Sequence, residues 1–306
     1  MSPPSAAATK LGIIGLDTSH ALVFSDTFNT PASPQFMPGA RVVAAWPGGS
    51  PDLPASISRV PAYTAEVRDK FGVAIVDRPE AVAEASDAIL ITSLDGRVHR
   101  AQFERIARCG KPVFIDKPFA TSTADARAIF AAAARHGVRM FSSSSLRFSN
   151  ALTRVVTPAG RAAVRGADFC GAAELEPTNP GLYWYGIHAV EMLYTAMGRG
   201  CLSVRCVSTA TQDLATGVWA DGRIGTVRGS RTGNYEFHGL VHFEKHSLPV
   251  NVQTEPRSFY ASLCEQILAL AQGGPVPVEP EETIEIIRFI EAANESSAAG
   301  GREVLL

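Results

Sequence analysis

A short turn near the N-terminus has the residue types of a phosphate-binding site. An apolar run over residues 11–16 is typical of a buried strand, and Gly15 lies near its end. The next three residues all favour helix N-termini: Asp17, Thr18 and Ser19. A helix that begins near His20 would present backbone N–H groups and the positive end of its dipole to an anion. The turn over residues 16–19 is therefore predicted to hold a dinucleotide pyrophosphate.

This turn departs from the Gly-x-Gly-x-x-Gly fingerprint of dinucleotide-binding folds. Gly15 takes the first position, but Asp17 stands at the second and His20 at the third. A side chain at the second position adds bulk where the phosphates approach the backbone, and a carboxylate adds like charge. Side-chain donors of Thr18, Ser19 and His20 would have to replace the missing glycine contacts. Taken alone, the turn also fits a structural role without a nucleotide.

An acidic residue that would bind a ribose hydroxyl is missing after the second predicted strand. Residues 41–46 are apolar enough for a buried strand, and the segment Trp46-Pro-Gly-Gly-Ser50 follows it. No arginine that would bind a 2′-phosphate adjoins Trp46. NAD and NADP are therefore both open.

Charge and cysteine usage narrow the class of partner. The formal net charge of −2 offers no general attraction to nucleic acid or to an anionic membrane, so we expect a small-molecule partner. Only five of the 28 basic residues are lysines, which limits the candidates for lysine chemistry. The five cysteines show neither paired spacing nor a Cys/His ligand pattern, so we expect no disulfide framework and no metal site.

The N-terminal segment predicts a cytoplasmic protein. Residues 1–9 are rich in Pro, Ala and Ser and lack the basic residues of a signal peptide. The apolar run after them is too short to span a membrane. We therefore expect a disordered leader over residues 1–9 and no membrane association.

Strands and helices alternate over the first half of the chain. Strand-like runs lie near residues 11–16, 41–46, 73–76, 88–92, 112–115 and 138–141, with helical segments between them. This order predicts parallel βαβ units with right-handed crossovers. After residue 150 the strand candidates follow one another closely, at residues 201–210, 214–220, 225–231 and 236–245. Their alternating pattern predicts an antiparallel sheet, with hairpin turns at Asp221-Gly and Gly233-Asn.

Three further segments, taken with the N-terminal turn, resemble the Gfo/Idh/MocA family of oxidoreductases. They are Phe114-Ile-Asp-Lys-Pro-Phe119, Ser145-Leu-Arg-Phe148 and Tyr183-Trp-Tyr-Gly-Ile-His-Ala-Val-Glu-Met-Leu193. The resemblance runs in register from about residue 10 to residue 306. It implies an α/β fold, with a doubly wound parallel Rossmann domain over residues 10–148. A substrate-binding and oligomerisation domain with an open, mostly antiparallel sheet would come next, over residues 149–306.

The resemblance implies catalytic roles for Lys117 and His188. Lys117 matches the family's Glu/Asp-Lys-Pro motif, where a lysine can hydrogen-bond the reacting oxygen, and burial would lower its pKa. His188 matches a family histidine and would carry a proton. Glu191 on the same helix face could orient it, or could simply cap and bridge. Trp184 stands where many relatives have Asp, so the proton relay would shrink to two residues. Trp184 could stack on the substrate or pack in the core.

The resemblance also implies the binding residues. Predicted substrate contacts are Lys117, Trp184 and His188. Predicted cofactor contacts are Gly15, Leu16, Asp17, Thr18, Ser19, His20, Trp46, Thr92, Ser93, Leu94, His99, Asp116, Lys117 and Arg147. Arg147 could instead serve only in an ion pair.

The resemblance predicts a dehydrogenase that uses NAD or NADP. It would transfer a hydride between the nicotinamide and a sugar, cyclitol or related polyol. One alternative keeps the fold and a bound NAD but performs net lyase, epimerase or hydrolase chemistry. Another is a non-catalytic binding protein with a decayed cofactor site. Because sheets of this family commonly pair between subunits, we expect a homodimer or homotetramer formed through the C-terminal sheet.

Overall fold

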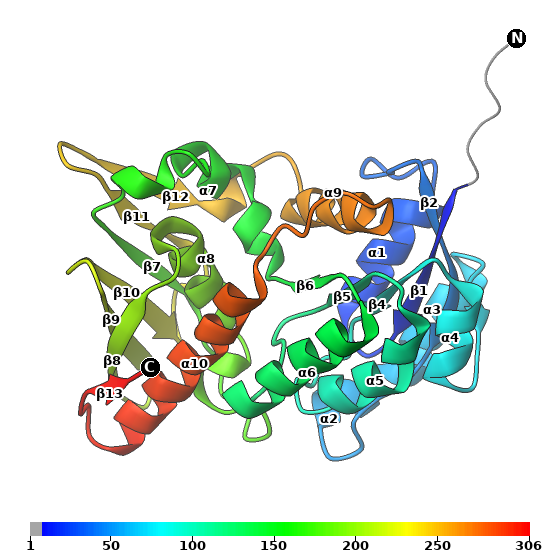
Figure 1. The fold of residues 1–306 in the computed structure, drawn as a ribbon, viewed down its shortest axis with the longest axis horizontal. Helices are drawn as coiled ribbons and strands as arrows, with labels where there is room; N and C mark the ends of the chain where they lie inside the picture. Colours follow the sequence, from blue (N-terminus) through cyan, green and yellow to red (C-terminus); the bar gives the residue numbers. More distant parts are fainter. Residues whose placement is uncertain (1–7) are drawn as a thin grey trace, which may run out of the picture. The chain divides into compact units, whose positions relative to one another are not determined.

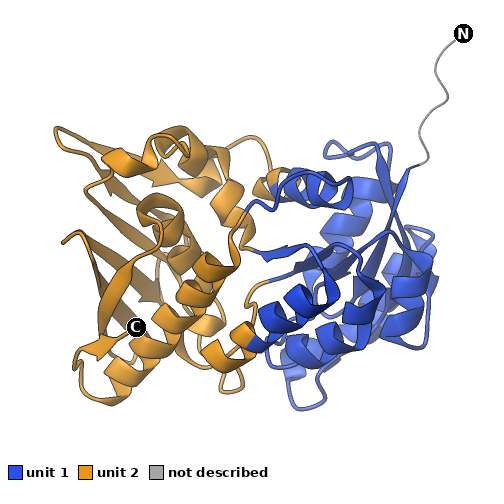
Figure 2. Cartoon of the chain, viewed as in Figure 1, with its two compact units in different colours: residues 1–116, 128–142, 263–277 blue, residues 117–127, 143–262, 278–306 orange. Residues whose placement is uncertain are grey.

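Two compact units make up the chain, and each contains one β-sheet (Figure 1 and Figure 2). The computed structural model describes residues 8–306. Unit 1 takes residues up to 116, then 128–142 and 263–277, and unit 2 takes 117–127, 143–262 and 278–306. The chain therefore passes between the units several times. A division into domains 10–148 and 149–306 stays a prediction.

Unit 1 is a doubly wound α/β sheet, as the sequence predicted. Its six strands are all parallel and lie in the order β3-β2-β1-β4-β5-β6. The strands are β1 (Thr9–Ile14), β2 (Ala40–Trp46), β3 (Ala74–Ile75), β4 (Ala88–Ile91), β5 (Val113–Ile115) and β6 (Met140–Ser142). The chain order reverses between β1 and β4, so the carboxyl ends of these strands form the switch point at which such sheets bind ligands.

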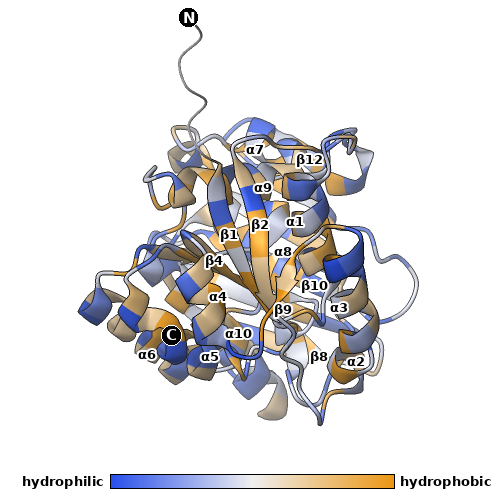
Figure 3. Ribbon diagram, turned by 90° about the vertical axis from the view of Figure 1, so that its right-hand side faces the viewer, coloured by the Kyte–Doolittle hydropathy of each residue, from blue (hydrophilic) through white to orange (hydrophobic). Residues whose placement is uncertain are grey.

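Helices surround this sheet because its strands are apolar on both faces. Every residue of β4 and of β5 is buried. Figure 3 shows hydrophobic residues concentrated in the strands and a mixture of hydrophobic and hydrophilic residues on the helices. The helices of the first half are α1 (Ser19–Asn29), α2 (Pro54–Ile57), α3 (Val60–Asp69), α4 (Pro79–Ala85), α5 (His99–Ile106) and α6 (Thr123–His136). The expected leader, residues 1–9, lies outside the described residues except for its last two, and Thr9 already belongs to β1.

Unit 2 contains a mostly antiparallel seven-stranded sheet in the order β12-β11-β7-β10-β9-β8-β13. Its strands are β7 (Gly166–Ala172), β8 (Cys201–Ser208), β9 (Gln212–Trp219), β10 (Ile224–Ser230), β11 (His238–His242), β12 (Ser247–Asn251) and β13 (Val304–Leu305). Helix α8 (Ile187–Met197) packs on β7 and β10, and α10 (Pro280–Ala298) packs on β8. All eleven residues of α8 are buried, which explains its apolar sequence on every side.

The remaining helices are short or pass between the units. They are α7 (Asn150–Val155) and α9 (Phe259–Ala271), with 3-10 turns at Ala107–Cys109, Ser145–Phe148, Arg161–Ala163, Gly181–Tyr183 and Val252–Thr254. Among the described helices, none is long and apolar enough to cross a membrane.

One predicted hairpin is present and the other is wrong. Strands β9 and β10 pair antiparallel around Asp221-Gly, as expected. The strands on either side of Gly233-Asn do not pair with each other, because β7 lies between β10 and β11. The sequence of β7, Gly-Ala-Asp-Phe-Cys-Gly-Ala, has two glycines and weak alternation, so it gave no strand signal. Because β7 was not predicted, β10 was expected to pair with the next strand along the chain, β11.

The turn after β1 requires a glycine for two reasons. Gly15 has a φ of +99°, in the region that residues with a side chain avoid. A Cβ at this position would lie 2.5 Å from the backbone N of Ser93, just after β4. The close approach of the two strand ends therefore depends on the missing side chain.

We predict that Gly15→Ala lowers the free energy of unfolding by about 2–4 kcal/mol, because backbone strain and overlap with Ser93 add together. Gly222→Ala is the matched control, since Gly222 also has a positive φ, +84°, but a Cβ there meets nothing within 4 Å. We expect the control to lose about 1 kcal/mol. Urea unfolding followed by circular dichroism measures both, and equal losses would contradict the role assigned to Ser93.

Candidate active site

The carboxylate of Asp17 points into the protein. One of its oxygens accepts a hydrogen bond from Ser56 Oγ at 2.5 Å, and the other accepts one from the backbone N–H of Leu94 at 3.0 Å. Asp17 is fully buried, and this burial raises its pKa, against the opposing hydrogen bonds. The acid at the second fingerprint position therefore joins three loops and is not presented to a phosphate.

The rest of the turn fits an anion. The N–H groups of Gly15 and Leu16 donate to the carbonyls of Trp46 and Pro47, at 2.9 and 2.7 Å. Within residues 8–306, no protein acceptor bonds the N–H of Thr18 or Ser19, and the first turn of α1 contains no acidic residue. Thr18 caps the helix, and its Oγ1 accepts the N–H of His20 at 3.4 Å. A pyrophosphate at this turn would thus be held from Thr18 onward, and Leu16 would contribute no N–H.

His20, at the third fingerprint position, pairs with Asp116. Its Nδ1 is hydrogen-bonded to Asp116 Oδ2, and both side chains are buried. The sequence predicted an imidazole donor to phosphate at this position. The structure instead directs Nδ1 at the residue that precedes Lys117.

The residues predicted at the end of β4 use their polar groups to build the turn. Thr92 Oγ1 donates to the Gly15 carbonyl at 2.6 Å, and Ser93 Oγ pairs with the side-chain amide of Gln102. His99 Nε2 donates to the Ser93 carbonyl at 2.8 Å. Thr92, Ser93 and His99 are almost completely buried, so they support the turn, and their predicted contacts to a cofactor stay predictions.

Trp46 and an ion-pair network lie at the carboxyl end of β2. The guanidinium of Arg105 lies 5.9 Å from the Trp46 ring centre. Arg97, from the turn after β4, donates to Asp95 and to Asp52, and Asp52 comes from the loop after β2. Arg97 is thus bound by two carboxylates, and the choice between NAD and NADP as the cofactor stays open.

Lys117 lies in unit 2 beside an aromatic ring. Its side chain is buried, with a residue exposure of 7%, and its Nζ lies 5.3 Å from the centre of the Tyr185 ring. An aromatic face at this distance attracts an ammonium group. The Tyr185 ring also lies 5.9 Å from the imidazole of His188, centre to centre. The two residues predicted to be catalytic therefore share one aromatic neighbour.

Ser144, and not Glu191, orients His188. The Ser144 hydroxyl lies 2.6 Å from His188 Nδ1, and its oxygen also accepts the N–H of Leu146. The Phe237 ring meets the imidazole edge-on at 5.2 Å between centres. The sequence analysis missed Ser144, Tyr185 and Phe237. For Ser144 the one available signal was its place in the serine run that leads into Ser145-Leu-Arg-Phe.

Glu191 instead belongs to a buried ion-pair cluster with Arg147. The Arg147 Nε donates to Glu191 at 2.7 Å, and its Nη1 donates to Glu282 at 2.5 Å. Burial alone would lower the pKa of Arg147, but the two carboxylates outweigh burial and raise it. Of the two roles expected for Glu191, the structure shows the bridge, because its carboxylate is bound to Arg147. Of the two roles predicted for Arg147, the structure shows the ion pair. A contact between Arg147 and a cofactor stays a prediction.

Trp184 packs in the interior of unit 2. Its exposure is 8%, and its ring meets Tyr185 edge-on at 6.3 Å between centres. Core packing was one of its two predicted roles, and a contact with substrate stays a prediction.

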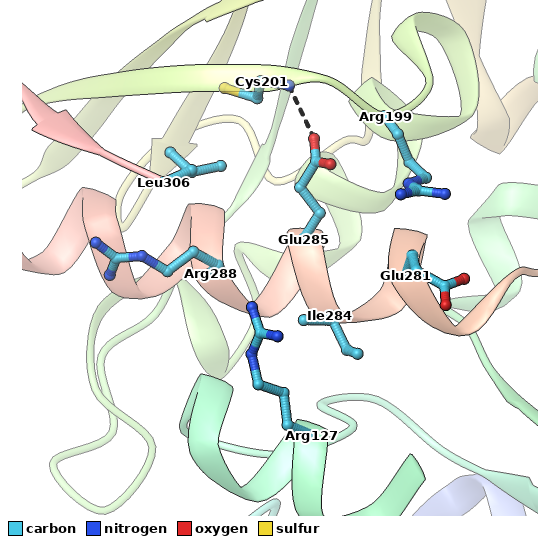
Figure 4. Close-up of a pocket in the computed structure, with 8 residues that line it drawn as sticks. All are labelled: Arg127, Arg199, Cys201, Glu281, Ile284, Glu285, Arg288 and Leu306. Atoms are coloured by element: carbon cyan, nitrogen blue, oxygen red, sulfur yellow. Dashed lines mark hydrogen bonds between the residues drawn. The ribbon is translucent and has the colours of Figure 1, made fainter. Parts of the chain in front are cut away.

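Unit 2 also has a pocket of about 360 Å³ that contains neither Lys117 nor His188. Charged side chains from α10 line much of it, and Glu285 accepts the backbone N–H of Cys201 there at 2.8 Å (Figure 4). The lining residues are Arg127, Arg199, Cys201, Glu281, Ile284, Glu285, Arg288 and Leu306.

Comparison with known proteins agrees with the family resemblance. Residues 11–144 match the Gfo/Idh/MocA family, described as an oxidoreductase family with an NAD-binding Rossmann fold. No curated protein matches the chain in sequence. The match confirms the resemblance over residues 11–144, and the motifs at residues 145–148 and 183–193 lie outside it.

Solved structures show the same fold over nearly the whole chain. A putative myo-inositol dehydrogenase from Sinorhizobium meliloti 1021 aligns with a TM-score of 0.81 and 17% identity, over 97% of this chain and 99% of that one. GenD2 from gentamicin A biosynthesis, in complex with NAD, gives 0.76 and 16%, over 100% and 99%. The scyllo-inositol dehydrogenase from Lactobacillus casei, with bound NAD(H) and scyllo-inositol, gives 0.79 and 14%, over 97% and 99%. At such identities the likeness is one of fold.

We predict that Asp17→Asn changes the pH dependence of stability. Because the pKa of Asp17 is raised in the folded protein, ionisation opposes folding, and wild-type stability falls as pH rises from 3.8 through the raised pKa. Asp17→Asn has no carboxyl to ionise at this position, so it does not lose stability in this way. The difference between its free energy of unfolding and that of the wild type should therefore rise from pH 4 to pH 7.

Urea midpoints at each pH measure this difference. Asp221→Asn is the control, because hydrogen bonds from Arg223 outweigh burial and lower the pKa of Asp221. Its relative stability should fall slightly over the acidic part of the same range. A pH-independent difference for Asp17→Asn would show that its carboxyl does not titrate abnormally.

Proposed function

We propose that this chain, whose residues 11–144 belong to the Gfo/Idh/MocA family of NAD-binding oxidoreductases, is an NAD(P)-dependent dehydrogenase of a sugar, cyclitol or related polyol. One observation carries the proposal. A buried lysine and a buried histidine, Lys117 and His188, lie around the same tyrosine ring, and the resemblance implies catalytic roles for both. The substrate class is supported by neighbours whose names include inositol dehydrogenases.

The turn after β1 would hold the cofactor. The N–H groups of Thr18 and Ser19 and the N-terminus of α1 suit the pyrophosphate. The Asp17 side chain does not take up the space of the phosphates, because its carboxylate is turned inward and bound to Ser56 and Leu94. When bound, the nicotinamide accepts or donates the hydride of the reaction.

Lys117 and His188 would manage the proton. As a hydride leaves the carbon of an alcohol, the hydroxyl proton must move to a base, and Lys117 would hydrogen-bond that hydroxyl and accept the proton. Ser144 holds the His188 imidazole in one orientation, as a proton carrier requires. The Tyr185 ring lies 5.3 Å from Lys117 Nζ, between centre and atom, and so packs beside the group that would carry the proton.

We predict that Lys117→Ala lowers kcat by about two to four orders of magnitude, the usual range for loss of a general acid or base. His188→Ala should lose less, since Lys117 is the direct proton acceptor. Both variants should bind the dinucleotide normally in titration calorimetry. Lys245→Ala, at an exposed position of unit 2, is the matched control and should have wild-type turnover.

The assay is turnover of NAD or NADP with a panel of sugars and cyclitols. Near-normal turnover by Lys117→Ala would show that the base is another residue. Dinucleotide binding without net reduction on any substrate would favour transient-oxidation chemistry or a binding role. No dinucleotide binding by the wild-type protein would overturn the proposal.

The sheet of unit 2 would form the subunit interface. Several large apolar side chains lie exposed on its strands, including Val207, Val218, Ile224 and Leu240 at 62, 38, 53 and 43%. Val218 and Ile224 are direct cross-strand partners and therefore share a face. Neighbouring exposed apolar residues on a sheet face mark a surface for association.

We predict that the double variant Val207→Glu/Ile224→Glu shifts the protein from a dimer or tetramer to a monomer, since it places charges in the buried interface. Light scattering coupled to gel filtration measures the mass. Leu175→Glu, at a loop position that is 57% exposed, is the control and should leave the assembly intact. A monomeric wild-type protein would refute the interface.

A further inference from the structure

We propose that His20 is a positioning residue for Lys117, acting through Asp116, an inference that rests on the proposed dehydrogenase function. His20 is the second residue of α1, and Asp116 directly follows β5. In the sheet, β4 separates β1 from β5, so the His20–Asp116 bond bridges the end of an intervening strand. The bond thus joins the phosphate-binding turn to the residue next to Lys117.

Both partners of the bond are held rigidly. The Asp116 N–H donates to the Ile91 carbonyl of β4 at 2.9 Å, which fixes its backbone in the sheet. The His20 ring lies 6.0 Å from the Phe24 ring, and Phe24 in turn meets Phe114 of β5 edge-on at 6.1 Å. Exposures of 6% for His20 and 2% for Asp116 keep water from competing for the bond. The Asp116 side chain therefore has a fixed anchor.

This anchor restrains the backbone at the point where Lys117 begins. Lysine has a flexible four-carbon side chain, so the position of its Nζ depends on how firmly its backbone is held. The main chain leaves unit 1 at Asp116 and enters unit 2 at Lys117. Fixing the Asp116 side chain restrains the peptide from which Lys117 projects. A glycine at position 20, the usual fingerprint residue, could not make this bond.

The test separates positioning from direct phosphate binding. His20→Phe keeps a buried ring of similar shape but removes the hydrogen bond. In His20→Phe the Asp116 carboxylate stays buried without this partner, which destabilises the fold. The double variant His20→Phe/Asp116→Leu also removes the carboxylate and so avoids this loss of stability. We expect kcat to fall about ten- to hundred-fold in both, the scale of a misplaced catalytic group, and the dinucleotide Kd of His20→Phe to stay within about threefold of the wild-type value. His246→Ala, at an exposed position, is the control.

A second readout needs neither cofactor nor substrate. With ¹³C-lysine labelling, the five lysines give few signals, and Lys117→Arg assigns the one from Lys117. Because Nζ lies 5.3 Å from the Tyr185 ring centre, the ring current should displace the Lys117 ε-CH₂ proton shift. We expect His20→Phe and the double variant to move this shift toward the value seen in Tyr185→Leu, and the control to leave it unchanged.

Three outcomes would overturn the inference. An unchanged Lys117 signal in both folded variants would show that the bond does not position the lysine. A large rise in the dinucleotide Kd with unchanged kcat would assign His20 to phosphate binding. Additive losses of kcat in His20→Phe and Asp116→Leu would show that the two residues act separately. Failure of the proposed function itself is distinct, because the wild-type protein would then bind no dinucleotide while its lysine signals stay measurable.

Discussion

A single buried carboxylate organises the loops at the carboxyl ends of β1, β2 and β4. Asp17 accepts hydrogen bonds from Ser56 and from the Leu94 N–H, and Ser56 Oγ in turn accepts the N–H of Ser50 at 2.8 Å. Removing such a group from water costs free energy, and its hydrogen bonds offset that cost only while all the loops stay in place. A side chain that looked like an obstacle to phosphate binding therefore builds the surface on which a phosphate could rest.

In unit 2, buried charged side chains are stabilised by one another in an ion-pair cluster. Arg147 lies between Glu191 and Glu282, and Arg161 adds a second cation to Glu282 at 3.3 Å. Burial raises the pKa of Glu191, and Arg147 opposes that shift. Because Glu191 and His188 lie three residues apart on α8, the cluster fixes the helix that presents the histidine. The imidazole is then oriented by Ser144, from the segment that also carries Arg147.

The sequence predicted elements with a strong local signal and missed those that depend on distant partners. Most of the parallel strands of unit 1 are short apolar runs, and the sequence was enough to predict that they alternate with helices in parallel βαβ units. Strand β7 has little local sequence signal, and its place in the sheet is specified by its neighbours β10 and β11. The predicted topology of the second sheet was therefore partly wrong. At the site, motif positions pointed to Lys117 and His188. The inward turn of Asp17 and the Ser144–His188 bond arise from contacts between residues far apart in sequence, which spacing does not reveal.

The interleaved path of the chain also sets the order in which the protein can be completed during synthesis. Residues 263–277 belong to unit 1, where Gly274 accepts a hydrogen bond from Arg139, and the last strand of that sheet ends at Ser142. The ribosome adds roughly 5–20 residues per second, so about 135 residues and roughly 7–27 s separate the end of the sheet, at Ser142, from the end of unit 1, at residue 277. During that interval unit 1 lacks residues 263–277, and the contacts that they make within it, such as that of Gly274 with Arg139, are not yet formed. Most of unit 1 is therefore synthesised first, but unit 1 is complete only once residue 277 has been added.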